Sequence, residues 1–180
     1  SSLDQQLRDQ MRDLTIKMLR STGAAGLIVT HDAADALRMA DRVAVQRAGR
    51  LVQIGTPENI YAAPADIGVA RMFGQVNTLS AGELGRDVLA PVGGAPACAW
   101  SANDMIGVRP VDIARAASGP AYAISARLVA QRHVGTGWLC DYELQSGALW
   151  QAVLREPATP EGDNFFVAAD RLMVFKQSEK

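Results

Sequence analysis

The sequence predicts an α/β portion followed by an all-β portion, with the change near residue 74. Before that point, apolar residues recur at helical spacing or form short continuous runs, as in helices packed around covered strands. Beyond it, glycine and proline become frequent while the apolar segments shorten and alternate, which indicates a small antiparallel sandwich or barrel. We therefore expect two domains, one over residues 1–74 and the other over residues 75–180.

Composition is that of an ordinary globular protein and argues against two other classes. The 180 residues are 48% hydrophobic and 21% charged, enough to bury a core. With a net charge of −1 and only 6% aromatic residues, the basic patch and stacking rings of a nucleic-acid binder are not expected. No apolar run reaches the roughly 18 residues that cross a bilayer, and the first residues lack the regions of a signal peptide. Cys98 and Cys140 do not form a CxxC metal motif, and we expect both thiols to be idle.

The first residues predict a helix followed by a buried strand. Asp4 is the expected N-cap of the helix, and Gly23 is its expected stop. The apolar face of this helix comprises Leu7, Met11, Leu14 and Met18. The run Gly26–Thr30 is apolar without alternation, which favours a strand covered on both faces, as in a parallel sheet.

Capping residues and a tight turn mark the elements that follow. N-caps of short helices are expected at Asp32, Thr56 and Asp66. Val43–Val45 is typical of a strand, and Ala48-Gly49 of a tight turn into a second strand over Arg50–Ile54.

The second portion predicts about seven short strands. The clearest candidates are Met105–Val108, Ser125–Ala130, Trp138–Leu144, Leu149–Leu154, Phe165–Ala168 and Leu172–Phe175. The stretch Ala90–Ala97, rich in proline and glycine, is the most loop-like of the chain.

His31 is the strongest candidate for chemistry. It follows the predicted buried strand and precedes a helix, and ligands of open α/β sheets bind at the carboxyl ends of strands. A histidine there can bond a phosphate or a reacting water, or it can simply close the turn. A phosphate cradle of the form G-x-x-x-x-G-K-[ST] is absent, and no apolar run leads into a Walker B acidic pair. His31 therefore lacks catalytic partners within this sequence.

Other candidate residues are weaker. His133, beside two glycines, is best interpreted as a solvated hairpin residue, and two distant histidines give no metal-ligand spacing. Three tryptophans, Trp100, Trp138 and Trp150, are better explained by core packing than by a ligand cleft.

Several segments of the first half resemble the ATP-binding proteins of ABC transporters. Ser1–Asp4 resembles their D-loop, and Ile28–Asp32 resembles their H-loop, or switch region. Ala40–Val45 and Gly49–Tyr61 resemble the segments after the switch, in the same order. The second half is similar to the TOBE domain, an OB-like β module of importer ATPases, through Ile106–Pro110. The resemblance thus implies an incomplete P-loop ATPase domain followed by an OB-like domain.

The resemblance implies roles for six residues. His31 would be the switch histidine, which contacts the γ-phosphate of ATP and counts as catalytic. Ser2, Asp4 and Asp32 would lie at the nucleotide and the interface between two ATPase subunits. Arg109 and Pro110 would form the Arg-Pro motif of the regulatory β domain.

The resemblance also implies cofactors, partners and a location. The complete protein would bind ATP and Mg²⁺, although neither is expected to bind this chain tightly. Its partners would be a second ATPase subunit, membrane-spanning permease subunits and a solute-binding protein, with no nucleic acid. It would be cytoplasmic, peripheral at the inner face of the cell membrane. The resemblance is strongest to the importers of iron(III), polyamines and sugars, and of these solutes we expect ferric iron.

The sequence departs from the family pattern at three places. Ala33, Ala34 and Asp35 stand where the family often has Gln-Glu-Glu. Val111 replaces the glutamate that usually follows Arg-Pro, which puts any role of that carboxylate in doubt. Leu79–Glu83 mimics the ABC signature sequence but follows the D-loop instead of preceding it, so we interpret it as a coincidence.

These observations predict the C-terminal portion of an importer ATPase, whether cleaved, engineered or naturally truncated, which should not hydrolyse ATP alone. The strand Leu27–Val29 would then have a bare edge, and we expect a second copy of the chain to cover it. Two alternatives remain: an oxyanion sensor using the turn Gly135–Gly137, and an interaction module that couples to membrane subunits.

Overall fold

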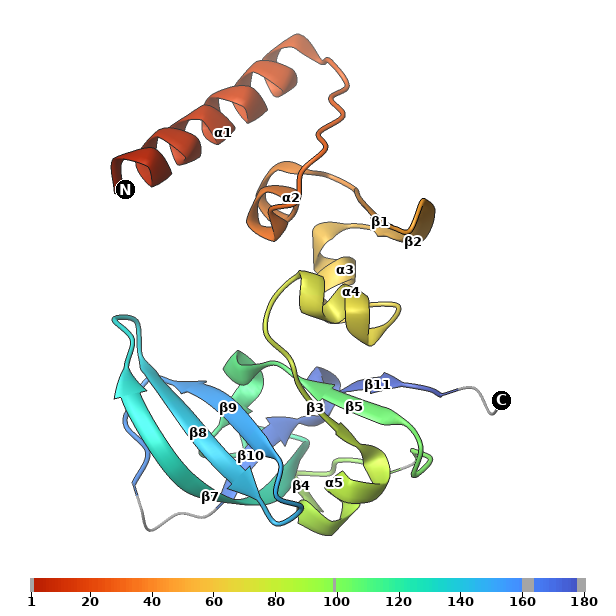
Figure 1. Ribbon diagram of the computed structural model, residues 1–180, viewed down its shortest axis with the longest axis vertical. Helices are drawn as coiled ribbons and strands as arrows, with labels where there is room; N and C mark the ends of the chain where they lie inside the picture. Colours follow the sequence, from red (N-terminus) through yellow and green to blue (C-terminus); the bar gives the residue numbers. More distant parts are fainter. Residues whose placement is uncertain (1, 99, 160–163, 178–180) are drawn as a thin grey trace. The chain divides into compact units, whose positions relative to one another are not determined.

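The computed structural model describes residues 2–98, 100–159 and 164–177, and for residues 2–5, 89 and 90 it describes the backbone alone. The chain divides into two compact units, Ser1–Ala65 and Asp66–Lys180. Figure 1 shows the elements of each unit. Among the described residues, no helix has both the length and the apolarity needed to cross a membrane.

The first unit consists of three helices and a two-stranded hairpin. Its elements are α1 (Ser2–Thr22), α2 (Ala33–Met39), β1 (Val43–Arg47), β2 (Arg50–Gly55) and α3 (Pro57–Ala62). The predicted turn is confirmed, because Ala48 and Gly49 both have positive φ, 49° and 76°, and β1 pairs antiparallel with β2. The cap at Thr56 is also confirmed, since the N–H of Asn59 donates to its hydroxyl over 3.3 Å.

Two sequence expectations for this unit are wrong. Gly26–Thr30 forms no strand, because no neighbouring strand within the described residues pairs with it. A strand hydrogen-bonds to a neighbour, so an apolar run cannot become one alone. Its side chains are consequently open to solvent, with Leu27 94% and Val29 92% exposed. Asp4 is not the N-cap of α1, because the helix begins earlier, at Ser2.

The second unit begins with a helix and continues as antiparallel sheets. Its main elements are α4 (Ile67–Met72), β3 (Asn77–Ser80), α5 (Ala81–Asp87), β4 (Val88–Val92), β5 (Met105–Val108), β6 (Ile113–Ala114), β7 (Ala121–His133), β8 (Trp138–Leu144), β9 (Leu149–Leu154), β10 (Asn164–Ala168) and β11 (Met173–Phe175). Two 3₁₀ turns, Pro110–Asp112 and Ala169–Arg171, join β5 to β6 and β10 to β11. Most predicted strands are confirmed, and the cap at Asp66 is confirmed by a 2.9 Å bond from the N–H of Val69.

Strand β7 organises the sheet. The first part of β7 pairs with β10 and β4, and the rest pairs with β8, with a register shift between Leu128 and Ala130. The strand order is β6-β10-β7-β8-β9, and a separate sheet has the order β11-β5-β3. The result is a strongly curled antiparallel sheet, as in an OB-like β domain (Figure 1). The chain is therefore a small α/β part followed by an all-β domain, as the sequence predicts.

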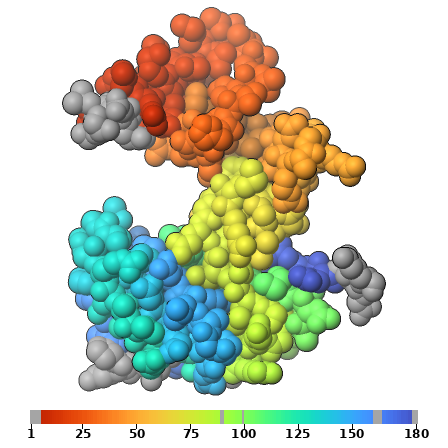
Figure 2. Space-filling model, in the orientation of Figure 1, coloured from red at the N-terminus to blue at the C-terminus, as the bar shows by residue number. Residues whose placement is uncertain are grey.

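A side chain joins the edges of the two sheets. The amide of Asn77, on β3, donates to the carbonyl of Gln151, on β9, over 2.7 Å and accepts from its N–H over 2.8 Å. Figure 2 shows the yellow residues around β3 lying against the blue surface of β8 and β9. Because Asn77 is only 6% exposed, these bonds form inside the unit.

The core of the second unit lies inside the curl. Its largest fully buried side chains include Trp150, Phe165, Leu84, Ile106 and Ile124. The rings of Trp150 and Phe165 stack with their centroids 6.0 Å apart.

The stretch predicted to be a loop is partly strand. The bounds of β4 include Ala90–Val92, so the expectation of a loop over Ala90–Ala97 is wrong for those residues. Proline is tolerated there because β4 pairs only with β7 and lies at an edge. Helix α5 was not predicted, although Ser80 is its N-cap: the N–H of Glu83 donates to the Ser80 hydroxyl over 3.3 Å, and that hydroxyl donates to the Glu83 carboxylate. The segment that mimics the ABC signature is therefore a helix cap.

Candidate functional site

The turn that carries His31 is held by short polar contacts. The carboxylate of Asp32 accepts from the N–H of Ala34 over 2.8 Å and caps α2, which confirms the predicted cap. The N–H of Asp32 donates to the hydroxyl of Thr30 over 3.0 Å, and that hydroxyl donates to Asp35 over 3.3 Å. Both neighbours of His31 are thus fixed, while His31 itself is exposed.

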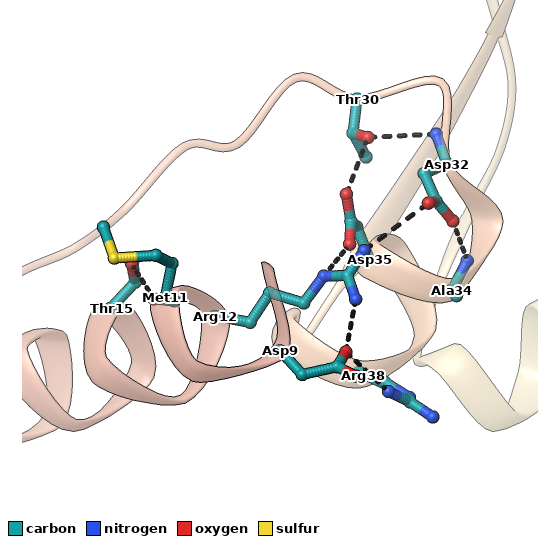
Figure 3. Close-up of polar contacts among 9 residues, drawn as sticks. All are labelled: Asp9, Met11, Arg12, Thr15, Thr30, Asp32, Ala34, Asp35 and Arg38. Atoms are coloured by element: carbon teal, nitrogen blue, oxygen red, sulfur yellow. Dashed lines mark hydrogen bonds and ion pairs between the residues drawn. The ribbon is translucent and has the colours of Figure 1, made fainter. Parts of the chain in front are cut away.

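A guanidinium from α1 completes the cluster (Figure 3). Arg12 contacts Asp9 on its own helix at 2.6 Å, Asp32 at 3.5 Å, and Asp35 through its Nε. Arg38 of α2 also contacts Asp9, at 3.3 Å. The side chain of Arg12 is only 11% exposed, whereas that of Arg38 is 65% exposed. Arg12 is therefore the covered centre of a network that joins α1 to the turn.

Hydrogen bonds and opposite charges in the cluster favour the charged forms of Asp32 and Arg12. The hydrogen bond from the N–H of Ala34 lowers the pKa of Asp32, and Arg12 and His31 add to that effect, which outweighs the opposing cost of burial. Burial alone would lower the pKa of Arg12, but its bonds to Asp9 and Asp35 raise it above its ordinary value. Asp32 and Arg12 consequently remain charged near neutral pH.

Two other residues that the resemblance assigns to the nucleotide site are described by their backbone alone. Ser2 and Asp4 lie in the first turn of α1, but their side chains are outside the part that the structure describes. Among the described residues, no group of three or more histidine, cysteine or acidic side chains could hold a metal ion. In the turn between Thr30 and Asp32, the exposed His31 is open to an incoming phosphate.

Arg109 and Pro110 belong to the interior of the second unit. Both are buried, and Nη1 of Arg109 donates to the carbonyl of Ala70, in α4, over 3.4 Å. Burial raises the pKa of nearby Asp112, while Arg171 and Arg109 act in the opposite direction. The Arg-Pro motif thus ties β5 to α4.

The three tryptophans and His133 lie where the sequence predicts them. Trp150 lies in the core, and Trp100 and Trp138 pack against it. His133 is exposed in the β7–β8 hairpin, where its ring meets that of Trp138 edge-on at 5.4 Å.

Two amides of the β7–β8 hairpin donate to groups within the hairpin itself. The N–H of Val134 donates to the carbonyl of Gly137 over 2.8 Å, and that of Gly135 donates to Nδ1 of His133 over 3.4 Å. Of the turn Gly135–Gly137, the amide of Gly135 is therefore engaged within the hairpin, which does not favour an oxyanion sensor built on that amide.

Sequence reasoning missed the Arg12 cluster. Asp9 and Arg12 are three residues apart on a predicted helix, a spacing that brings opposite charges together. That signal was present, but the link from Arg12 to Asp35 spans 23 positions and depends on how α1 and α2 pack.

Comparisons with known proteins agree with the resemblance, although no family model matches the chain. The Fe(3+) ions import ATP-binding protein FbpC 1 of Rhodococcus jostii is 37% identical over 149 residues, which are 81% of this chain and 42% of that protein. The glucose import ATP-binding protein GlcV of Saccharolobus solfataricus is 37% identical over 113 residues, 63% of this chain and 32% of GlcV. The spermidine/putrescine import ATP-binding protein PotA of Methylococcus capsulatus is 49% identical over 82 residues, 45% of this chain and 21% of PotA. The chain spans about two fifths of the length of FbpC 1.

Proposed function

The chain is a homologue of import ATP-binding proteins of ABC transporters, and we propose that it supplies the switch-histidine part and the regulatory β domain of such a subunit. The observation that carries this proposal is His31, exposed on a turn whose two flanking residues are fixed by hydrogen bonds. A side chain held in this way can reach the γ-phosphate of ATP without a change in its backbone. The chain would thereby help to couple ATP hydrolysis to solute uptake.

The exposed apolar surface of the first unit supports an interface with an ATP-binding part. Leu7, Met11, Leu14 and Met18 are each more than half exposed along α1, and the apolar run near Leu27 and Val29 is open. Exposed apolar surface of this extent marks an interface. In the proposal, the part with the P-loop covers it and brings ATP and Mg²⁺ to His31.

The test is to join this chain to the preceding part of FbpC 1, which by the resemblance carries the P-loop. We expect the joined protein to hydrolyse ATP with Mg²⁺, and His31→Ala to reduce kcat about 100-fold, as for the loss of a general acid or base. His133→Ala is the matched control, because it removes the other histidine, exposed in the second unit. Hydrolysis by the unjoined chain, or full activity of the His31→Ala protein, would contradict the proposal.

The partners in this proposal are a second ATPase subunit, permease subunits and a solute-binding protein, at the cytoplasmic face of the cell membrane. Without the P-loop part, the exposed apolar surface of the first unit should be covered by a second copy of the chain. Light scattering of the unjoined chain should therefore give a dimer at micromolar concentration. A monomer would rule out this self-association.

For the solute, we propose ferric iron. Two Fe(3+) import proteins of Rhodococcus jostii match 81% and 82% of this chain, whereas two spermidine/putrescine import proteins match 45% and 46%. Cells that lack their own ferric importer ATPase should regain iron uptake when they make the joined protein. Recovery of polyamine or glucose uptake without iron uptake would contradict this choice.

A further inference from the structure

Arg12 connects α1 to both sides of the His31 turn. Its guanidinium contacts the cap residue Asp32, which follows His31, and Asp35, whose carboxylate holds Thr30, which precedes His31. We propose that Arg12 is a positioning residue that fixes the His31 turn to α1. Its effect on catalysis rests on the proposed function, but its effect on the turn does not.

The chemistry of the contact requires arginine. Arg12 meets three carboxylates in different directions, at Nη1, Nη2 and Nε. A guanidinium presents five N–H donors in a rigid plane and can serve all three, whereas a lysine ammonium is a single point charge on a flexible stem. Arg12→Lys therefore keeps the charge of the cluster but removes its geometry.

Two polar links between α1 and α2 are seen among the described residues. The apolar stripe Leu7, Met11, Leu14 and Met18 of α1 is exposed, whereas Ile16 and Leu19, on the same face of the helix as Arg12, are partly covered. A second polar link, from Arg38 to Asp9, is made by a side chain that is 65% exposed, and exposed ion pairs contribute little. Of these two described links, the contacts of Arg12 with Asp35 and Asp32 are therefore the more covered and the stronger.

The consequence is that α1 and the His31 turn move as one body. The first turn of α1 contains Ser2 and Asp4, which the resemblance places at the interface between ATPase subunits. A displacement of α1 at that interface would pass through Arg12 to the backbone on both sides of His31. Formation of the subunit interface would thus help to set the position of the switch histidine.

The first test measures amide hydrogen exchange by NMR in the full chain. In Arg12→Met we expect the hydrogen-bonded amides of Asp32 and Ala34 to exchange about tenfold faster, with Arg12→Lys in between. Arg8→Met is the matched control, because it removes an exposed arginine from the same helix. The amide of Ile60 in α3 is the internal reference, since it reports any general loss of stability. Equal exchange in Arg12→Met and Arg8→Met would overturn the proposal.

The second test uses the joined ATPase and a double-mutant cycle. Arg12→Met should lower kcat for ATP hydrolysis at nearly constant KM, and it should cause no further loss in a His31→Ala protein. Additive losses would mean that Arg12 does not act through His31. If His31→Ala alone has no effect, the proposed function fails, and the exchange experiment still decides whether Arg12 holds the turn.

Discussion

The two units of this chain differ in how completely they bury their apolar side chains. The second unit curls its sheet around a closed core in which Trp150, Phe165 and Ile106 are almost completely buried. The first unit leaves Met18 62% and Leu27 94% exposed and fully buries few large side chains, among them Ile60. An antiparallel sheet that turns back on itself supplies its own cover, whereas the first unit is left open along its apolar surface.

The largest effect should come from the core of the second unit. Trp150→Ala should reduce the free energy of unfolding of that unit by about 3–5 kcal/mol, because it leaves a large cavity. Met11→Ala, on the exposed face of α1, should change stability by less than about 0.5 kcal/mol. Urea titration followed by far-ultraviolet circular dichroism measures both. Equal losses would mean that the two units are equally closed.

A smaller effect should follow from the polar link between the sheets. Asn77→Ala leaves the buried N–H and carbonyl of Gln151 without their partner, which should cost about 1–3 kcal/mol. Gln75→Ala is the control, because Gln75 contacts the side chain of Gln151 at an exposed position. Urea midpoints of the two variants would test whether the link stabilises the curl. A Gln75→Ala loss as large as that of Asn77→Ala would contradict this.

The two units should also respond oppositely to acid. The folded pKa of Asp32 is lowered, so its stabilising effect exists above its unfolded pKa, near 3.9, and is lost as pH falls through the folded value. The folded pKa of Asp112 is raised by burial, so its contribution is present below the unfolded pKa and is lost as pH rises through the folded value.

Below about pH 4, we therefore expect α2 to fray first. NMR shifts of Ala34 between pH 6 and pH 3 would follow this, with Asp32→Asn as a cap that does not titrate. The same acid response in Asp32→Asn would show that another group is responsible.

The smallest effect concerns the two thiols, both in the second unit. Cys98 is exposed and Cys140 is buried, and burial raises the pKa of both above the ordinary thiol value. A thiol reagent at pH 8 should modify one cysteine of the native chain, slowly, and Cys98→Ser should abolish this reaction. Fast modification of Cys140 would indicate that the core opens.

Local signals were enough to predict much of the fold. The caps at Asp32, Thr56 and Asp66 each depend on one side chain and the following turn, so sequence alone reveals them. The strands Trp138–Leu144 and Leu149–Leu154 alternate between faces, and their bounds agree with the structure.

Features that depend on distant partners were not predictable in the same way. Gly26–Thr30 has the composition of a strand but no neighbour to pair with in the described residues. In the candidate site, His31 was proposed from its position and Asp32 was expected as an N-cap, whereas the contact between Arg12 and Asp35 was not expected, because it requires the packing of two helices. Sequence patterns therefore predicted the candidate site but not the contacts of Arg12 with its turn.

The bond pair between Asn77 and Gln151 has a consequence for association between molecules. Strand β9 ends the order of the six-stranded sheet, and such an edge is a template to which a strand of another chain can add. The amide of Asn77 occupies the N–H and carbonyl of Gln151 at the middle of that edge. An incoming strand would have to displace this side chain before it could form continuous hydrogen bonds with β9. At that position of β9, the asparagine side chain thus takes the place that the backbone of a neighbouring strand would occupy.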